Sequence, residues 1–255
     1  MSLIKIVSGW SNPGGSTVHF IELCNLLNDN GFDCTFYGHH TWHLDKCKSG
    51  TLNDANLTED DTLISHFVKV KNSVKKHILS CHETNMFPLK EMDLQRYDLI
   101  HFVSNFQKKW HSVNHPSVII PPVVEKVKWK DPKSNIAAVI GSIDSHKQTD
   151  KSIYRALTDG YDQVHIYGAM TDPVYYKDKV LHFVESEAAV LKGVVCNRRK
   201  MYKHVSKVYH SSIRETYGLV EAECKLAGIP FDGPSNNQDI LDKSEILERW
   251  KKILV

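Results

Sequence analysis

Short apolar runs alternate with helical patterns along most of this chain, and that alternation limits the fold more than any other feature. Residues 3–7 (LIKIV) have the composition of a buried strand, and the loop that follows, residues 8–15, is rich in small residues and helix breakers. Apolar residues then recur at helical spacing over residues 16–30, and residues 34–37 predict a second strand. A strand, a loop, a helix and a parallel strand form the right-handed βαβ unit of an α/β domain.

The same alternation continues towards the C-terminus. Pro121 and Pro122 form a stiff break, which suits a crossing between two domains. The pattern predicts an α/β protein with two Rossmann-like, doubly wound domains, residues 1–125 and 126–240, and a C-terminal helix in residues 241–255 that packs back towards the first domain. Further strands are predicted at 77–80, 99–103, 118–120, 137–140, 164–167, 191–195 and 207–210, and further helices at 150–157, 198–206, from residue 218 onwards and at 241–254.

Composition is that of an ordinary soluble globular protein. The 255 residues are 41% hydrophobic and 24% charged. No apolar run approaches the about 18 residues of a membrane-spanning helix, and the opening MSLIKIVSGW turns polar too early for a secretory signal. We therefore expect a cytoplasmic protein. The six cysteines include no CxxC pair, which predicts free thiols instead of a disulfide scaffold or a zinc cluster: Cys24, Cys34, Cys47, Cys81, Cys196 and Cys224.

Charge is distributed unevenly between the two halves. The formal net charge is +2, but residues 1–125 carry 11 lysines and arginines against 13 acidic residues, whereas the remainder carries 21 against 17. The positive second half suits a phosphate-bearing ligand, and neither half has the strongly basic composition of a nucleic-acid binder. Residues 67–79 carry four lysines among apolar residues, which predicts the solvated face of a helix, with contact to an anionic membrane as the alternative.

The segment ETYGLVEAECKLAGIP is the most informative stretch. Glu215 and Glu223 flank seven residues, and Tyr217-Gly218 follows the first glutamate. A helix that begins near Gly218 offers free backbone N–H groups and a positive dipole end to a diphosphate. Glu215 lies before this helix, where it can accept hydrogen bonds from sugar hydroxyls, and Glu223 lies about a turn and a half into it, within reach of a ribose diol. The alternative is a solvated helix face that carries two glutamates.

This segment resembles the EX7E signature of retaining glycosyltransferases with the GT-B fold, in the GT4-like group 1 family that includes glycogen and lipopolysaccharide transferases. Residues 12–19 (NPGGSTVH) resemble the family's first loop, in which Gly14 and Gly15 let the backbone approach the donor phosphate and the acceptor. Residues 81–83 (CHE) resemble the strand-end histidine segment of the family, which implies that His82 lies near the reacting sugar. A surface histidine is the alternative for His82.

The second half resembles the same family in the expected order. Residues 139–147 resemble a GR…K segment whose arginine and lysine clamp the donor diphosphate. Lys147 matches the lysine, but Ser142 stands where the arginine is expected, and a hydroxyl supplies no charge. His146, Arg198 and Arg199 are the candidates to compensate. Residues 191–195, which include Val194, resemble the strand whose backbone faces the nucleobase.

The resemblance implies a retaining transfer of a sugar from UDP, GDP or a similar nucleotide to an acceptor hydroxyl of a glycan, a lipid-linked sugar or another compound. Glu215 and His82 then act on the sugar, while Lys147, the Gly15 loop and the helix start at Gly218–Leu219 stabilise the departing diphosphate. The 15 histidines form no HExxH or HxH set and no DxD triplet occurs, so we expect no obligatory metal and no cofactor.

Three other functions stay open at this stage. One is a nucleotide-sugar epimerase or a phosphorylase of the same fold. The second is a transferase whose acceptor is hydroxylated DNA, against which the acidic balance of residues 1–125 argues because DNA affinity depends on phosphate contacts. The third is a non-catalytic module that binds a sugar or a nucleotide, an alternative suggested by Ser142 in place of the arginine of the family.

Overall fold

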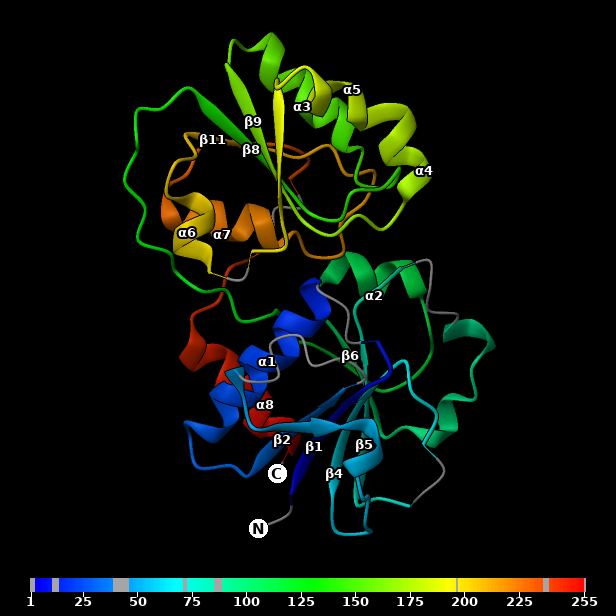
Figure 1. The fold of residues 1–255 in the computed structure, drawn as a ribbon. Coiled ribbons are helices and arrows are strands. Elements are labelled where there is room, and N and C mark those ends of the chain that lie inside the picture. Colours follow the sequence, from blue (N-terminus) through cyan, green and yellow to red (C-terminus); the bar gives the residue numbers. More distant parts are fainter. Residues whose placement is uncertain are drawn as a thin grey trace. The chain divides into compact units, whose positions relative to one another are not determined.

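The computed structural model describes residues 3–10, 14–38, 46–70, 73–84, 89–195, 197–235 and 239–254. Asn12 and Pro13 of the predicted glycine loop, residues 85–88 and Cys196 lie outside the described residues. The chain divides into two compact units. The first unit consists of Met1–Val123 with Gln238–Val255, and the second unit consists of Val124–Asn237 (Figure 1).

The first unit is built on seven parallel strands in the order β3-β2-β1-β4-β5-β6-β7. The strands are β1 (Ile4–Ser8), β2 (Cys34–Gly38), β3 (Ser49–Thr51), β4 (Thr62–His66), β5 (Lys76–Cys81), β6 (Leu99–Phe102) and β7 (Ser117–Ile119). The helices are α1 (Gly15–Asn28), α2 (Asn105–His111) and α8 (Lys243–Leu254), with single 3-10 turns at Leu52–Asp54, Leu89–Glu91 and Leu94–Arg96. The direction of winding reverses between β1 and β4, which is the switch point of a doubly wound sheet.

The core of the first unit explains why these segments fold together. β1 is buried along its whole length because it pairs on both sides, with β2 and with β4. α1 and α8 lie beside each other (Figure 1), and α8 inserts Ile246 and Trp250 into the same cluster as Ile6 of β1 and Phe20 of α1. The last helix of the chain therefore completes the core that the first strand begins.

The second unit contains five parallel strands in the order β10-β9-β8-β11-β12. The strands are β8 (Ile136–Ile140), β9 (Gln163–Tyr167), β10 (Ala189–Gly193), β11 (Lys207–Tyr209) and β12 (Phe231–Asp232). The helices are α3 (Thr149–Thr158), α4 (Pro173–Tyr175), a π-helical segment (Tyr176–Val180), α5 (Leu181–Glu185), α6 (Arg198–Tyr202) and α7 (Leu219–Ala227). Here the winding reverses between β8 and β11.

Both faces of the second sheet are covered, as the apolar composition of its strands requires. Alternate residues of β8 point to opposite faces: Ala137 packs in the cluster that contains Ile153 of α3, whereas Ala138 packs in the cluster that contains Tyr202 of α6 and Cys224 of α7. The prediction of an α/β architecture with two Rossmann-like sheets is confirmed.

Several sequence interpretations were wrong in detail. The described part of residues 67–79 contains no helix, and its last residues belong to β5, a buried inner strand. The strand expected at 191–195 ends at Gly193, where the backbone turns left-handed and the pairing with β9 shifts register. The helix expected at 198–206 ends at Tyr202. Five further features had no predicted counterpart: β3, β4, β12, α2 and the helical run from α4 to α5.

None of the helices in the described ranges combines the length and the apolar character needed to cross a membrane. The five cysteines within those ranges are free thiols, in line with the expectation from their spacing.

We predict that Trp250→Ala destabilises the protein by about 3–5 kcal/mol, because the indole is fully buried in the core of the first unit and its removal leaves a large cavity. Trp110→Ala is the matched control, since that indole is 42% exposed on α2. Urea unfolding followed by circular dichroism measures both changes. Equal losses of stability in the two variants would show that α8 does not hold the core together.

Candidate functional site

The carboxyl ends of β8 and β11 bring two loops of the second unit together. The two strands are parallel neighbours at the switch point, where ligands bind in sheets of this kind. The loops are joined directly: Ile213 donates its backbone N–H to the carbonyl of His146 (3.0 Å), and the His146 ring Nε2 lies 3.0 Å from the carbonyl of Arg214. His146, proposed above as a substitute for the missing arginine, is thus a joint between the loops.

Glu215 lies in the second of these loops, and its carboxylate binds two basic side chains. The Lys147 ammonium donates to Oε1 at 2.5 Å, and the His210 Nε2 lies 2.7 Å from the same oxygen. The side chain is only 16% exposed. Burial alone would raise the pKa of Glu215, but the hydrogen bond with His210 and the charge of Lys147 outweigh it and hold the pKa far below its usual range. Glu215 is therefore ionised at neutral pH.

Asp144 shapes the loop that presents Lys147. Its Oδ1 accepts the backbone N–H of Lys147 at 2.8 Å, and its Oδ2 accepts the hydroxyls of Ser142 at 2.5 Å and Thr171 at 3.0 Å. Ser142 therefore helps to fix the turn, and its hydroxyl is directed at a carboxylate. A further constraint comes from Gly168, where a Cβ would lie 1.7 Å from the carbonyl oxygen of Gly141 and where φ is +154°. Only glycine allows the loops after β8 and β9 to come so close.

α7 begins immediately after Glu215-Thr216-Tyr217-Gly218. Gly218 adopts a left-handed conformation with φ of +85°, which a glycine tolerates at no steric cost, and Leu219 is the first helical residue. The N-cap residue of α7 is a glycine and so provides no side-chain cap. Its first backbone N–H groups and its positive dipole end are therefore suited to an anion.

Glu223 lies one helical turn further along α7 and is 5% exposed. Its carboxylate accepts hydrogen bonds from Arg198 Nε (3.0 Å) and from the Tyr202 hydroxyl (2.7 Å), both of which come from α6. Burial, together with the charge of Glu223, raises the pKa of Tyr202 well above its usual value. The phenol therefore stays protonated and donates a hydrogen bond to Glu223. Arg198, another proposed substitute for the missing arginine, thus serves Glu223.

Glu221 provides a useful comparison on the same helix. It is as buried as Glu223, but its partners are the Lys225 ammonium, 2.7 Å away, and the Ser235 hydroxyl. Two buried glutamates two residues apart therefore have different partners, and Glu223 is the one bonded to Arg198 and Tyr202 of α6.

The remaining predicted residues of the second unit are less tightly grouped. Tyr217 is almost fully buried before α7. Val194 is 40% exposed and follows β10, an edge strand that β9 separates from β8. The structure therefore brings Lys147 and Glu215 into contact and places Gly218, Leu219 and Glu223 on one helix, but it leaves Val194 at the border of the sheet.

In the first unit, Gly14 and Gly15 lie at the start of α1. Gly14 is the N-cap residue in an extended conformation, and its carbonyl accepts the backbone N–H of Val18 at 3.1 Å. Here too the N-cap residue is a glycine, which provides no side-chain cap. Because α1 follows β1, these glycines lie beside the switch point of the first sheet.

His82 follows β5 directly and is buried, so it is not a surface histidine. Its Nε2 lies 3.0 Å from the Ser80 hydroxyl, and its ring contacts those of His19, Phe20 and His66. Burial, reinforced by the neighbouring histidines, lowers the pKa of His82 well below its usual value, so the ring is neutral at physiological pH.

A polar chain that the sequence analysis missed also lies at this edge of the first sheet. The Ser8 hydroxyl lies 2.9 Å from Nδ1 of His66, and Nε2 of His66 lies 3.1 Å from the Glu83 carboxylate. Ser8 ends β1, His66 ends β4 and Glu83 follows β5, so three neighbouring strands contribute. In the sequence, the only available signal was a polar residue at each strand end. His210, at the end of a predicted strand, carried the same signal in the second unit.

Solved structures provide the comparison with known proteins, since no protein-family model and no curated protein matches the chain. HepE from Anabaena, solved in complex with UDP and glucose, is 10% identical with a TM-score of 0.68, over 91% of this chain and 80% of HepE. WaaG, a glycosyltransferase involved in lipopolysaccharide biosynthesis, is 10% identical with a TM-score of 0.63, over 99% of this chain and 90% of WaaG. An alpha-glucosyltransferase in complex with UDP and a mismatched 13-mer DNA is 15% identical with a TM-score of 0.59, over 98% of this chain and 88% of the glucosyltransferase. The chain therefore has the GT-B fold.

We predict that Glu215→Gln destabilises the protein by about 3 kcal/mol at pH 6, because Lys147 and His210 lose a charged partner. The pKa of Glu215 is lowered in the folded protein, so its ionised form contributes stability that is complete above about pH 5 and is lost as the pH falls towards the folded pKa. The difference between wild type and variant should therefore shrink between pH 5 and pH 3, as measured by urea unfolding.

The matched control is Glu248→Gln, because the Glu248 side chain is 61% exposed in its pair with Lys251 and contributes little. A stability difference between wild type and Glu215→Gln that stays constant from pH 6 to pH 3 contradicts the assignment.

Proposed function

We propose that this chain is a retaining glycosyltransferase of the GT4-like group, which moves a sugar from a UDP- or GDP-linked donor to an acceptor hydroxyl. One observation carries the proposal: Glu215, paired with Lys147, lies at the switch point of the second sheet and shortly before the glycine-capped start of α7, the helix that carries Glu223. In a sugar attached to a diphosphate, the carboxylate can bind the sugar hydroxyls, and the cation and the helix N-terminus can bind the diphosphate.

The diphosphate is the best match for Lys147 and α7. The Lys147 side chain is partly exposed and is paired with Glu215. A diphosphate at the start of α7 receives backbone N–H groups, and the Lys147 ammonium can bind it while staying close to Glu215. Ser142 supplies no charge, since its hydroxyl binds Asp144. In this chain, Lys147 and the helix dipole therefore bind the diphosphate, which an arginine and a lysine bind in the family.

Glu215 suits the sugar, because it is held ionised and is fixed from one side. Lys147 and His210 both bind Oε1. An ionised carboxylate has about four acceptor positions, enough to bind sugar hydroxyls beside protein donors. Glu223 suits the ribose for the same reason: Arg198 and Tyr202 fix the carboxylate and leave acceptor positions for a diol.

The proposed reaction exchanges one bond at the anomeric carbon. The bond to the donor phosphate oxygen breaks and the diphosphate keeps the electron pair, while the acceptor oxygen forms the new bond and passes its proton to the departing diphosphate. Charge that builds on the diphosphate is stabilised by Lys147 and by the start of α7. Retention of the anomeric configuration rests on the resemblance of residues 215–223 to the EX7E signature.

The first unit carries the acceptor in this proposal, with the neutral ring of His82 and the Glu83 carboxylate at the ends of its strands. One structural neighbour, an alpha-glucosyltransferase, was solved with UDP and DNA, which makes a hydroxylated DNA base the second candidate acceptor. The acidic balance of residues 1–125 favours a glycan or a lipid-linked sugar instead. Parallel assays with oligosaccharides and with oligonucleotides that contain hydroxymethylated bases distinguish the two.

We predict that Glu223→Ala weakens the binding of the free nucleotide about tenfold or more, because charge-assisted hydrogen bonds to the ribose are lost. Glu215→Ala should not weaken nucleotide binding, since Lys147 remains available, but it should reduce turnover about a hundredfold, the cost of losing one transition-state contact. Calorimetry with UDP and GDP measures the first effect, and release of nucleotide from the donor sugar measures the second.

Glu221→Ala is the matched control for both variants, because Glu221 is equally buried on α7 but binds Lys225 and Ser235. It should bind nucleotide and turn over like the wild type. The assignment is overturned if Glu223→Ala and Glu215→Ala both behave like Glu221→Ala.

We also predict that turnover does not depend on added Mg²⁺ or Mn²⁺, because no DxD triplet is available to bridge an ion to the diphosphate and Lys147 supplies the positive charge. Initial rates with and without each ion test this. A reaction that stops without Mn²⁺ or Mg²⁺ and resumes when the ion returns contradicts the proposed way of stabilising the leaving group.

A further inference from the structure

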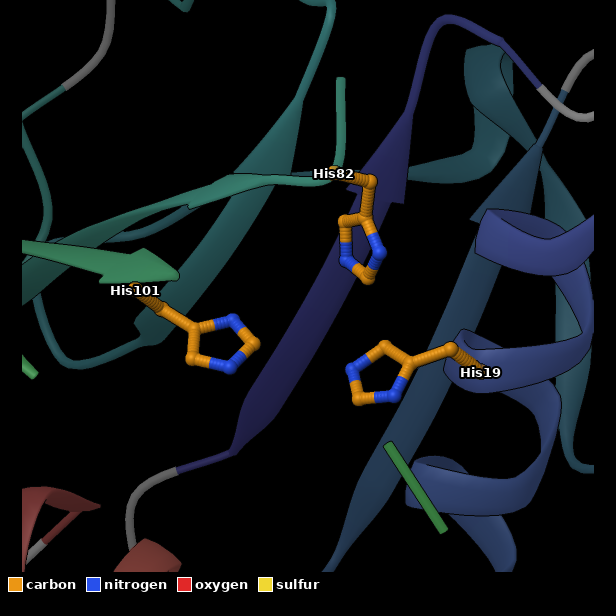
Figure 2. Close-up of side chains that lie close together, drawn as sticks. All are labelled: His19, His82 and His101. Carbon is orange, nitrogen blue, oxygen red and sulfur yellow. The ribbon is translucent and has the colours of Figure 1, made fainter. Parts of the chain in front are cut away.

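Three histidines that lie far apart in the sequence meet inside the first unit. His19 comes from α1, His82 follows β5 and His101 lies on β6, and Figure 2 shows their rings turned towards one another. One ring nitrogen from each lies within 4.8 Å of the other two. All three side chains are buried. Short ligand motifs such as HExxH do not reveal this group, because its members are 63 and 19 residues apart along the chain.

His19 is the member of the group whose ring nitrogens lack hydrogen-bond partners among the described residues. It is 1% exposed. Buried polar groups almost always have a partner, and each exception calls for an explanation. His19 offers a lone pair or an N–H to the space it shares with His82 and His101.

The hydrogen bonds around Ser80 fix the protonation of the other two rings. His101 Nε2 donates to the carbonyl of Ile120 at 2.8 Å, so its Nδ1 carries the lone pair and accepts the Ser80 hydroxyl, also at 2.8 Å. The Ser80 oxygen then accepts the N–H of His82 Nε2 at 3.0 Å. His82 Nδ1 is therefore left with a lone pair.

We propose that His19, His82 and His101 bind one transition-metal ion of the zinc class through Nδ1 of His82, Nδ1 of His101 and one nitrogen of His19. Neutral imidazole is a preferred ligand of Zn²⁺, Co²⁺ and Ni²⁺. The second nitrogens of His82 and His101 already donate to the Ser80 and Ile120 oxygens, which is how the outer partners of metal-bound histidines orient their rings. On binding, Ser80 releases Nδ1 of His101 and keeps its bond with His82.

Small side-chain movements complete the site. Zinc–nitrogen bonds of about 2.0–2.1 Å in a tetrahedral arrangement bring the nitrogens about 3.4 Å apart, so separations of up to 4.8 Å must close by up to about 1.4 Å. His66 stays outside, since Ser8 and Glu83 hold both of its nitrogens.

This site lies in the first unit and shares His82 with the proposed acceptor side, but the proposal does not rest on the proposed function and is tested without an activity assay. The full chain is stripped with a chelator and titrated with Zn²⁺ while the melting temperature is recorded, and with Co²⁺ while visible absorption is recorded. Wild type should melt higher with zinc and should show the strong absorption of four-coordinate cobalt. His19→Leu should bind zinc at least about tenfold more weakly, because one of three ligands is lost, and the stripped variant should fold, since leucine replaces a buried imidazole without partners.

The matched control is His77→Gln, because His77 is a buried histidine outside the group, bonded to Ser65. It should respond to zinc and cobalt like the wild type. His101→Gln should lose the response as His19→Leu does, which keeps the test decisive if one variant folds poorly. The proposal is overturned if zinc raises the melting temperature of wild type and His19→Leu equally, if it raises neither, or if cobalt gives only the weak absorption of the hydrated ion.

Discussion

The buried carboxylate of Glu215 is the interaction on which the proposed donor site depends. It binds Lys147 from the loop after β8 and His210 from the end of β11, so a single oxygen joins the two strands that border the switch point. The backbone contacts between His146 and residues 213–214 hold the same two loops together. The backbone contacts therefore set the position of the segment that leads into α7, and the bonds of Glu215 place its carboxylate beside Lys147.

Each unit applies the same geometric principle with different chemistry. In both sheets the winding reverses beside the first strand of the unit, and in both a helix with a glycine N-cap begins near that point: α1 in the first unit and α7 in the second. Around α7 the side chains are carboxylates with basic partners. Next to α1 they are mostly neutral histidines and hydroxyls, with Glu83 as the acidic group at the strand ends. This contrast supports a charged donor on the second unit and an acceptor on the first.

The sequence was sufficient where periodicity is strong and insufficient where partners come from distant segments. The apolar runs of β1, β8 and β9 and the glycine before α7 predicted those elements because each depends on local sequence. β4 was missed because its sequence, Thr62–His66, mixes polar and apolar residues in a strand that is buried on both faces. The partners of Glu223 could not be predicted, because Arg198 and Tyr202 lie on another helix and only the packing of α6 against α7 brings them close.

The central claim is that a nucleoside diphosphate binds between Lys147 and the start of α7. Hydrogen–deuterium exchange of the full chain, with and without saturating UDP or GDP, tests it most directly, because bound phosphate oxygens protect the backbone N–H groups that they accept. Protection should be confined mainly to residues 141–148 and 213–224, the two loops that Glu215 joins and the first turns of α7. Protection that appears elsewhere and leaves both segments unchanged, although the nucleotide is bound, would contradict the account.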